Sequence, residues 1–128
     1  MYESMMTFLY IEDTKKASEF FEEVLKLKAV FKPSWATVYQ VSTNAYLGVV
    51  DREKGSVDTQ YKGGTLISLT VDSVEPYYNR LKTYGLDELS EIKVFEDIGV
   101  KSFFFKGPGG YDFEIQMFTN PEIKKLFK

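Results

Sequence analysis

Two stretches, MTFLYIEDTKKASEFF at residues 6–21 and LISLTVDSVEPYYNRL at residues 66–81, decide the fold of this chain. Each begins with a short apolar segment, passes through a polar segment that contains an aspartate, and ends in apolar residues spaced three and four apart. This pattern predicts a strand, a helix cap and a helix with one buried face. Because the two stretches match element for element, the sequence predicts an internal repeat.

Three β-prone segments follow each of these helices. They span 28–31, 35–41 and 45–50 after the first helix, and 92–95, 101–106 and 111–117 after the second. Polar, proline and glycine residues separate them, as is typical of turns between strands. The sequence therefore predicts an α+β fold of two βαβββ modules, which pair into a curved mixed sheet with helices on the outer face and a central cleft.

The length of 128 residues predicts a single domain over residues 1–128. We place its parts at about 4–51 for module one, 52–63 for a polar linker, about 64–118 for module two and 120–127 for a C-terminal helix. Asn120 and Pro121 favour that last helix, because asparagine caps well and proline is tolerated at the first helical position. The alternative of two α+β halves that are alike by coincidence stays open.

Composition and charge argue against several classes of protein. The chain has 44% hydrophobic and 27% charged residues, which is typical of a globular protein. Its net charge of −3, without a long basic cluster, argues against nucleic acid as a partner. No apolar run reaches the roughly 20 residues of a membrane span, and the N-terminus does not resemble a signal peptide. We expect a cytoplasmic protein with neither a nucleic-acid nor a membrane partner.

The absence of histidine and of cysteine restricts the chemistry further. It excludes disulfides, thiolate nucleophiles and sulfur-ligated zinc, and it removes the commonest metal ligand and general base. Aromatic residues make up 16% of the chain. They fill cores and line ligand pockets equally well, and core filling is the simpler interpretation.

Three stretches together resemble the vicinal oxygen chelate superfamily, which includes glyoxalase I, extradiol dioxygenases, fosfomycin-resistance enzymes and bleomycin-binding proteins. FLYIEDTKKASEFFEEVLKLK (8–28) is similar to the family's opening strand and helix, ISLTVDSVEPYYNRLKTYG (67–85) to their second-module counterpart, and FFFKGPGGYDFEIQMF (103–118) to its closing hairpin. The resemblance implies the fold described above. In catalytic members it also implies a divalent metal, held by a His or Gln and a Glu from the first module and a His and a Glu from the second.

Most of these ligand positions have lost their donor in this sequence. Carried over in chain order, the four positions fall on Met6, on Tyr46 or Gly48, on Leu66, and on Glu114. A thioether is a poor ligand for a hard or borderline cation, and leucine cannot coordinate at all. The family's turn aspartate is also changed, to Gly107. We therefore predict no metal and no other cofactor.

Strand alternation places Asp112, Glu114 and Gln116 on one face of the last strand and its apolar residues on the other. The candidate ligand-binding residues on the cleft side are Met6, Phe8, Tyr46, Leu66, Ser68 and Glu114, joined by Trp35 and Tyr39, which share a predicted strand face and are placed to cap the cleft. Two simpler interpretations stay open. In one, Glu114 is partly exposed, or hydrogen-bonded to Tyr46, Ser68 or a dimer mate, and has no chemical role. In the other, Trp35 and Tyr39 belong to the core or a dimer interface.

The leading hypothesis is a metal-free protein that binds a small molecule, sequesters an antibiotic or a metabolite, and forms a homodimer. A second is a lyase, isomerase or dioxygenase with a remodelled site, in which Glu114 is the general base and Tyr46 the acid. A third is a non-catalytic scaffold or regulator with a vestigial cleft. The sequence identifies neither the ligand nor any catalysis, and it does not decide whether the cleft lies within one chain or across a dimer.

Overall fold

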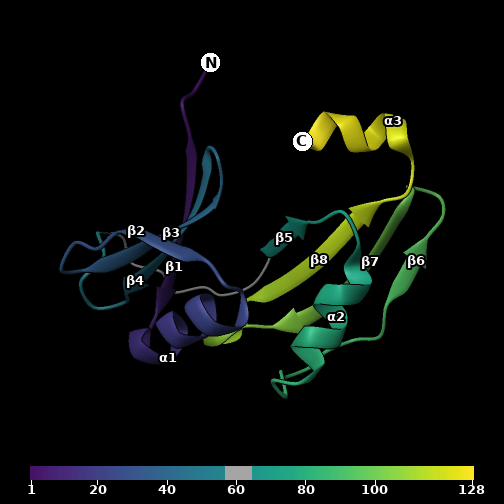
Figure 1. The fold of residues 1–128 in the computed structure, drawn as a ribbon. Coiled ribbons are helices and arrows are strands. Elements are labelled where there is room, and N and C mark those ends of the chain that lie inside the picture. The colour runs from purple at the N-terminus through teal and green to yellow at the C-terminus, as the bar shows by residue number, and fades with distance from the viewer. Residues whose placement is uncertain (57–64) are drawn as a thin grey trace. The chain divides into compact units, whose positions relative to one another are not determined.

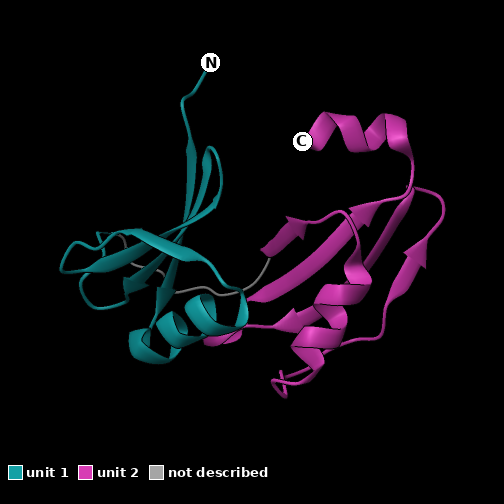
Figure 2. Cartoon of the chain, in the orientation of Figure 1, with its two compact units in different colours: residues 1–62 teal, residues 63–128 magenta. Residues whose placement is uncertain are grey.

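The computed structural model describes residues 1–56 and 65–128 (Figure 1). The chain divides into two compact units, Met1–Lys62 and Gly63–Lys128 (Figure 2), and each is considered by itself. Residues 57–63 of the predicted linker lie outside the described residues.

The first unit contains one four-stranded sheet and one helical segment. Its elements are β1 (Met5–Ile11), α1 (Thr14–Glu19), a π-helical turn (Phe20–Val24), β2 (Lys28–Phe31), β3 (Ala36–Ser42) and β4 (Ala45–Asp51). The strand order is β1-β4-β3-β2, with β1 parallel to β4 and the other neighbours antiparallel. The sheet is therefore mixed, and β1, the first strand along the chain, pairs with β4, the last.

The second unit repeats this order. Its elements are β5 (Leu66–Thr70), α2 (Val74–Lys82), β6 (Lys93–Phe95), β7 (Val100–Lys106), a 3₁₀ turn (Pro108–Gly110), β8 (Asp112–Phe118), α3 (Pro121–Lys124) and a closing 3₁₀ turn (Lys125–Phe127). The strand order is β5-β8-β7-β6, again with the first strand parallel to the last. The predicted α+β class and the repeated βαβββ order are confirmed, as two four-stranded mixed sheets.

The first helix begins where the sequence places its cap. The Asp13 carboxylate accepts a 3.0 Å hydrogen bond from the backbone N–H of Lys16, which satisfies one otherwise unpaired amide of the first turn. Ala17, Phe21 and Val24 are the buried residues of this segment. Because they lie three to four residues apart, they form one stripe, and that stripe packs on the sheet of the first unit.

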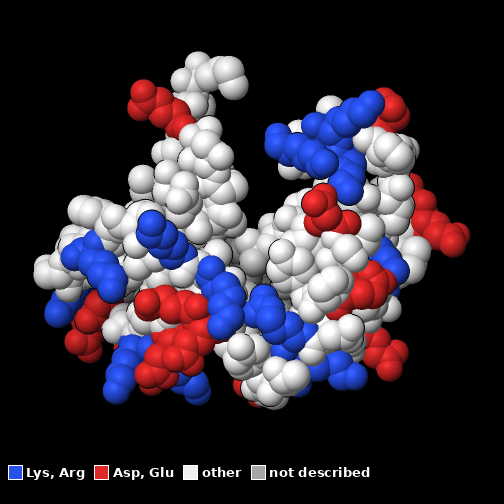
Figure 3. Space-filling view, in the orientation of Figure 1, with Lys and Arg blue, Asp and Glu red and all other residues white. Residues whose placement is uncertain are grey.

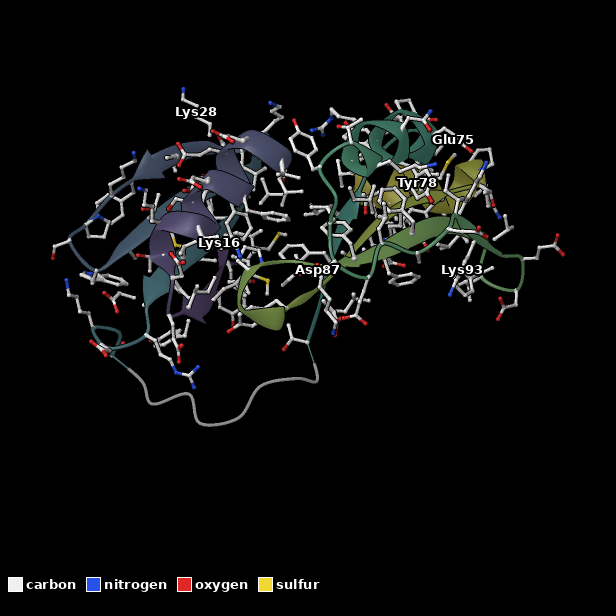
Figure 4. All side chains as sticks on the ribbon, turned by 90° about the horizontal axis from the view of Figure 1, so that it is seen from below. Lys16, Lys28, Glu75, Tyr78, Asp87 and Lys93 are labelled. Atoms are coloured by element: carbon white, nitrogen blue, oxygen red, sulfur yellow. The ribbon has the colours of Figure 1, made fainter. Side chains whose placement is uncertain are left out.

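Stacked phenylalanines form the core of the second unit. Phe103, Phe105 and Phe113 are each at most 2% exposed, and the rings of Phe105 and Phe113 stack with centroids 5.5 Å apart. Tyr78 of α2 meets Phe103 edge-on at 5.0 Å. This face of the sheet therefore lies under α2. Figure 4 shows Glu75 and Tyr78 on the α2 side and Lys93 on the opposite side of the sheet.

An ion pair between Lys101 and Glu75 ties β7 to α2. The hydrogen bond from Lys101 is the largest of the effects that lower the pKa of the Glu75 carboxyl. We expect Lys101→Met to raise that pKa back toward the ordinary value of 4.5, measured by an NMR titration of the glutamate carboxyl carbons.

The sign of the effect fixes the pH range. A carboxyl whose pKa is lowered on folding stabilises the folded state above its unfolded pKa, and this contribution is lost as the pH falls through the folded pKa. The wild type and Lys101→Met should therefore differ most above the ordinary glutamate pKa and converge in acid. Lys93→Met, on the other sheet face, is the matched control, and an unchanged Glu75 pKa in Lys101→Met would contradict the assignment.

Candidate functional site

The four metal-ligand positions of the resemblance fall on both units. In the first, Met6 of β1 is the register partner of Tyr46 of β4, and Phe8 is the partner of Gly48. In the second, Leu66 of β5 is opposite Asp112, and Ser68 is opposite Glu114. Because register partners in neighbouring strands point to the same side, each unit presents its positions on one sheet face.

The first unit carries an exposed aromatic patch on this face, which consists of Met6, Phe8 and Trp35. Met6 is 49% exposed, Phe8 and Trp35 are each 40% exposed, and the rings of Phe8 and Trp35 lie 6.1 Å apart. The Phe8 ring lies directly over Gly48, because a Cβ added there would be 2.4 Å from a ring carbon. Glycine at this position therefore provides the space for the ring.

Tyr46 lies beside this patch with its hydroxyl already engaged. It is half-buried, and its hydroxyl donates to the backbone carbonyl of Thr43 at 3.4 Å. The hydroxyl therefore has a partner within its own hairpin.

Trp35 and Tyr39 do not share a strand face, contrary to the sequence prediction. Trp35 precedes β3 and contacts Phe8, whereas Tyr39 is fully buried and stacks on Phe21 at 5.6 Å. The Tyr39 hydroxyl donates to Glu22 Oε2 at 3.0 Å, and burial raises the pKa of Tyr39. The prediction failed because strand alternation was extended to Trp35, which belongs to the preceding turn.

The second unit presents a polar face on the side of its sheet opposite α2. Two rows of register partners cross it. One row is Ser68, Glu114 and Phe104, and the other is Thr70, Gln116, Ser102 and Lys93. We call these seven residues the polar face. Within it, Gln116 Nε2 donates to Thr70 Oγ1 at 3.2 Å, and Lys93 Nζ lies 5.9 Å from the centre of the Phe104 ring.

Glu114 is the acid of the polar face and is held in place by a serine. It is only 9% exposed, and the Ser68 hydroxyl donates to its Oε1 at 2.8 Å. Ser68 is one of the partners that the sequence left open for Glu114, in the interpretation that gives this acid no chemical role. In the described part of the chain, Ser68 is the one partner of this carboxylate, so Oε2 retains its full capacity to accept hydrogen bonds.

The residues at the family's metal-ligand positions do not fit a transition-metal ion. Such an ion takes three or four nitrogen, sulfur or carboxylate donors. Across residues 1–56 and 65–128 no group of three or more Asp, Glu, His or Cys is placed to hold a metal. Asp112, the acid nearest to Glu114 along β8, is paired with Lys106 Nζ at 2.6 Å. Glu114 is therefore the one carboxylate among the residues at these positions.

A separate hollow of about 280 Å³ opens in the first unit, beside α1, where β3 begins and β4 ends. Its lining is mostly polar and includes Lys15, Ser18, Thr37, Asp51 and Lys54 together with Trp35. Of the predicted site residues, only Trp35 borders it. Lys54 and Asp51 are 3.9 Å apart, so part of the charge in this hollow is already balanced.

Charged side chains of both signs lie on the surface of each unit. On the face that Figure 3 shows, basic and acidic side chains intermingle on both units. None of the described helices has the length and apolar character to cross a membrane.

Three residues of the polar face were missed in the sequence: Ser102, Phe104 and Lys93. Alternation along β7 was the available signal, because burying Phe103 and Phe105 under α2 turns Ser102 and Phe104 to the other side. Lys93 had no comparable signal. Its place depends on the pairing of β6 with β7, which the sequence does not specify.

The family model "Glyoxalase/Bleomycin resistance protein/Dioxygenase superfamily" matches residues 5–115. The comparison with curated proteins gives no match.

Several solved structures share the fold. Lactoylglutathione lyase from Agrobacterium tumefaciens has a TM-score of 0.73 and 20% identity, over 88% of this chain and 91% of that one. The fosfomycin resistance protein FosX from Listeria monocytogenes has a TM-score of 0.75 and 14% identity, over 97% and 98%. A glyoxalase/bleomycin resistance protein/dioxygenase from Nocardioides has a TM-score of 0.74 and 16% identity, over 94% and 85%. At these identities the likeness concerns the fold alone.

Proposed function

Because this chain belongs to the glyoxalase/bleomycin resistance protein/dioxygenase superfamily, we propose that it is a metal-independent member that binds a small organic molecule on the polar face of its second unit. One observation carries the proposal. The single retained acid, Glu114, is buried and oriented by Ser68, while a thioether and a hydrocarbon stand at Met6 and Leu66. The proposed site therefore has one oriented carboxylate, and the other metal-ligand positions lack donors suited to a metal.

The chemistry of the polar face supports a small organic cation as the ligand. Glu114 Oε2 is available to accept a charge-assisted hydrogen bond from an ammonium or amidinium group. Phe104, the register partner of Glu114, offers a half-buried ring on which an apolar or aromatic body can pack. Binding without turnover is sequestration, so we propose an antibiotic or a metabolite of this class as the natural ligand.

We also propose that the protein is a homodimer. The exposed aromatic patch of Met6, Phe8 and Trp35 supports this, because exposed apolar patches mark interaction surfaces. The measurement is the molar mass in solution by light scattering, and a monomer at micromolar concentration would contradict it. The cytoplasmic location remains an expectation from the sequence.

Glu114→Gln tests the proposed function. A thermal-shift screen of small molecules on the wild type should find amines and amidines that raise the melting temperature. In Glu114→Gln the affinity for them should fall at least about ten-fold, because a hydrogen bond to a charged group contributes about 1.5–3 kcal/mol. Isothermal titration calorimetry measures the affinity directly.

Glu96→Gln is the control for the effect of Glu114→Gln on binding. Glu96→Gln removes an exposed acid of the same unit and should leave binding unchanged. Elemental analysis of the purified protein is the second arm. Stoichiometric zinc, nickel, iron or manganese that is lost in Glu114→Gln would overturn the metal-independent proposal, and so would hits that bind Glu114→Gln as tightly as the wild type.

A second candidate function is catalysis with Glu114 as a general base. The observation in its favour is that a serine fixes the carboxylate in one orientation, as a base that must meet a proton requires. Tyr46 is a weak choice for the acid, since its hydroxyl already donates to Thr43. Mass spectrometry of each ligand after incubation with the protein distinguishes the two candidates, because sequestration returns the compound unchanged.

A further inference from the structure

The polar face contains one hydroxyl that has no hydrogen bond. Ser102 is 0% exposed. Among the buried side-chain oxygen and nitrogen atoms of the described residues, its Oγ is the one without a hydrogen-bond partner. The other two hydroxyls of the face are paired, Ser68 with Glu114 and Thr70 with Gln116. Ser102 is therefore the exception within an otherwise satisfied set of side chains.

An unpaired buried hydroxyl needs an explanation, because burial removes its hydrogen bonds to water and no hydrogen bond within the protein replaces them. Alanine would fit the same position at no such cost. The register places Ser102 between Gln116 and Lys93, and diagonally next to Glu114. Diagonal neighbours of this kind are about 7–8 Å apart in an antiparallel pair. One small molecule can therefore contact both the Glu114 carboxylate and the Ser102 hydroxyl.

We infer that Ser102 is a specificity residue of the ligand site and that the ligand carries an oxygen acceptor a few bonds from its cationic nitrogen, as an amino alcohol or an aminated sugar does. This inference rests on the proposed function and narrows its ligand class. The Ser102 hydroxyl donates to the ligand oxygen, and Glu114 Oε2 accepts from the ligand nitrogen. A site built for an oxygen discriminates against ligands that lack it, since the buried hydroxyl is then left unpaired.

Because Ser102 is fully buried, a neighbouring side chain has to rotate for the ligand to reach it. Lys93 is exposed and Gln116 is half-buried, and both are long, unbranched side chains. Lys93 is the register partner of Ser102, and its Nζ lies 5.9 Å from the centre of the Phe104 ring. Exposed side chains of this kind change rotamer in picoseconds to nanoseconds, so no backbone rearrangement is required.

A matched pair of probes tests the specificity. Phenethylamine and 2-amino-1-phenylethanol share a ring and an ammonium group and differ by one hydroxyl. Protein-observed NMR titration at millimolar concentration should show that the wild type prefers the amino alcohol by about ten-fold, which is the 1.4 kcal/mol of one hydrogen bond. Ser102→Ala should abolish this preference while its melting temperature stays equal to that of the wild type or rises. Ser42→Ala, an exposed serine of β3, is the control.

Ser102→Cys tests access without depending on the ligand. The chain has no cysteine, so the substitution introduces a single thiol. In the native protein this thiol should react with methyl methanethiosulfonate much faster than the protein unfolds, and 2-amino-1-phenylethanol should slow the reaction. A thiol that reacts only upon unfolding would overturn the inference.

The outcomes separate this inference from the proposed function. If both probes bind, both are lost in Glu114→Gln, and the preference persists in Ser102→Ala, the inference fails and the proposed function stands. If neither probe binds the wild type, the amino-alcohol class is wrong. If binding to the wild type does not depend on Glu114, the proposed function fails as well.

Discussion

Replacing Phe113 with alanine is expected to destabilise the protein by about 3–5 kcal/mol, the usual cost of removing a fully buried phenylalanine ring. Phe113 is 0% exposed, and its ring stacks on Phe105, which packs on Phe103 beneath α2. The substitution leaves a cavity between rings that cannot close without moving the sheet. Urea denaturation followed by far-ultraviolet circular dichroism measures the loss.

Phe127→Ala is the matched control for this prediction. Phe127 also stacks on a phenylalanine, with its centroid 4.8 Å from that of Phe118, but it is 59% exposed. Its removal should cost far less, because most of its ring already faces water. Equal losses of stability for Phe113→Ala and Phe127→Ala would contradict the description of the core.

The second large effect is expected at Gly107, where alanine should cost about 1–3 kcal/mol through overpacking. A Cβ added at this position would lie 2.5 Å from Phe113 Cε2 and 2.9 Å from Cδ2. The backbone at Gly107 has φ −102°, which any residue adopts, so the cost comes from the clash and not from strain. The Phe113 ring thus occupies the space of a side chain at Gly107, the position at which the resemblance implies an aspartate.

A double-mutant cycle isolates that clash. In a Phe113→Ala background the ring is absent, so Gly107→Ala should cost little, and the coupling between the two sites should account for most of the single-mutant effect. Gly110→Ala is the control, because Gly110 has φ +75° and open space around it. Its cost reflects backbone strain and should be the same in both backgrounds. An equal cost of Gly107→Ala in both backgrounds would refute the steric explanation.

Most of the fold could be predicted because its signals are local. Asp13 caps α1 as its position indicated, and the eight strands lie within about a residue of the segments that alternation favoured. The π-helical turn at Phe20–Val24 was not predicted. An apolar stripe such as Ala17, Phe21 and Val24 has the same spacing in either kind of helix, so the stripe does not distinguish them.

The candidate site was only partly predictable, because it depends on which residues become neighbours across strands. Glu114 and Ser68 were identified, and they are hydrogen-bonded. Ser102 was missed. Alternation along β7 places it on the side opposite α2, but its neighbours there follow from the register of β7 with β6 and β8, which the sequence does not specify. Tyr39 illustrates the opposite error, since a buried aromatic residue looks the same in a sequence whether it lines a core or a ligand site.

The parallel pairing of first strand with last strand dictates an order of events during synthesis. Met5 of β1 pairs with Ala45 of β4, and Leu66 of β5 pairs with Asp112 of β8. On the ribosome, each first strand emerges long before its partner exists. The apolar residues of β1 therefore stay unpaired until the hairpin of β3 and β4 has left the exit tunnel. The sheet that bears Glu114 is completed only after β8 has emerged.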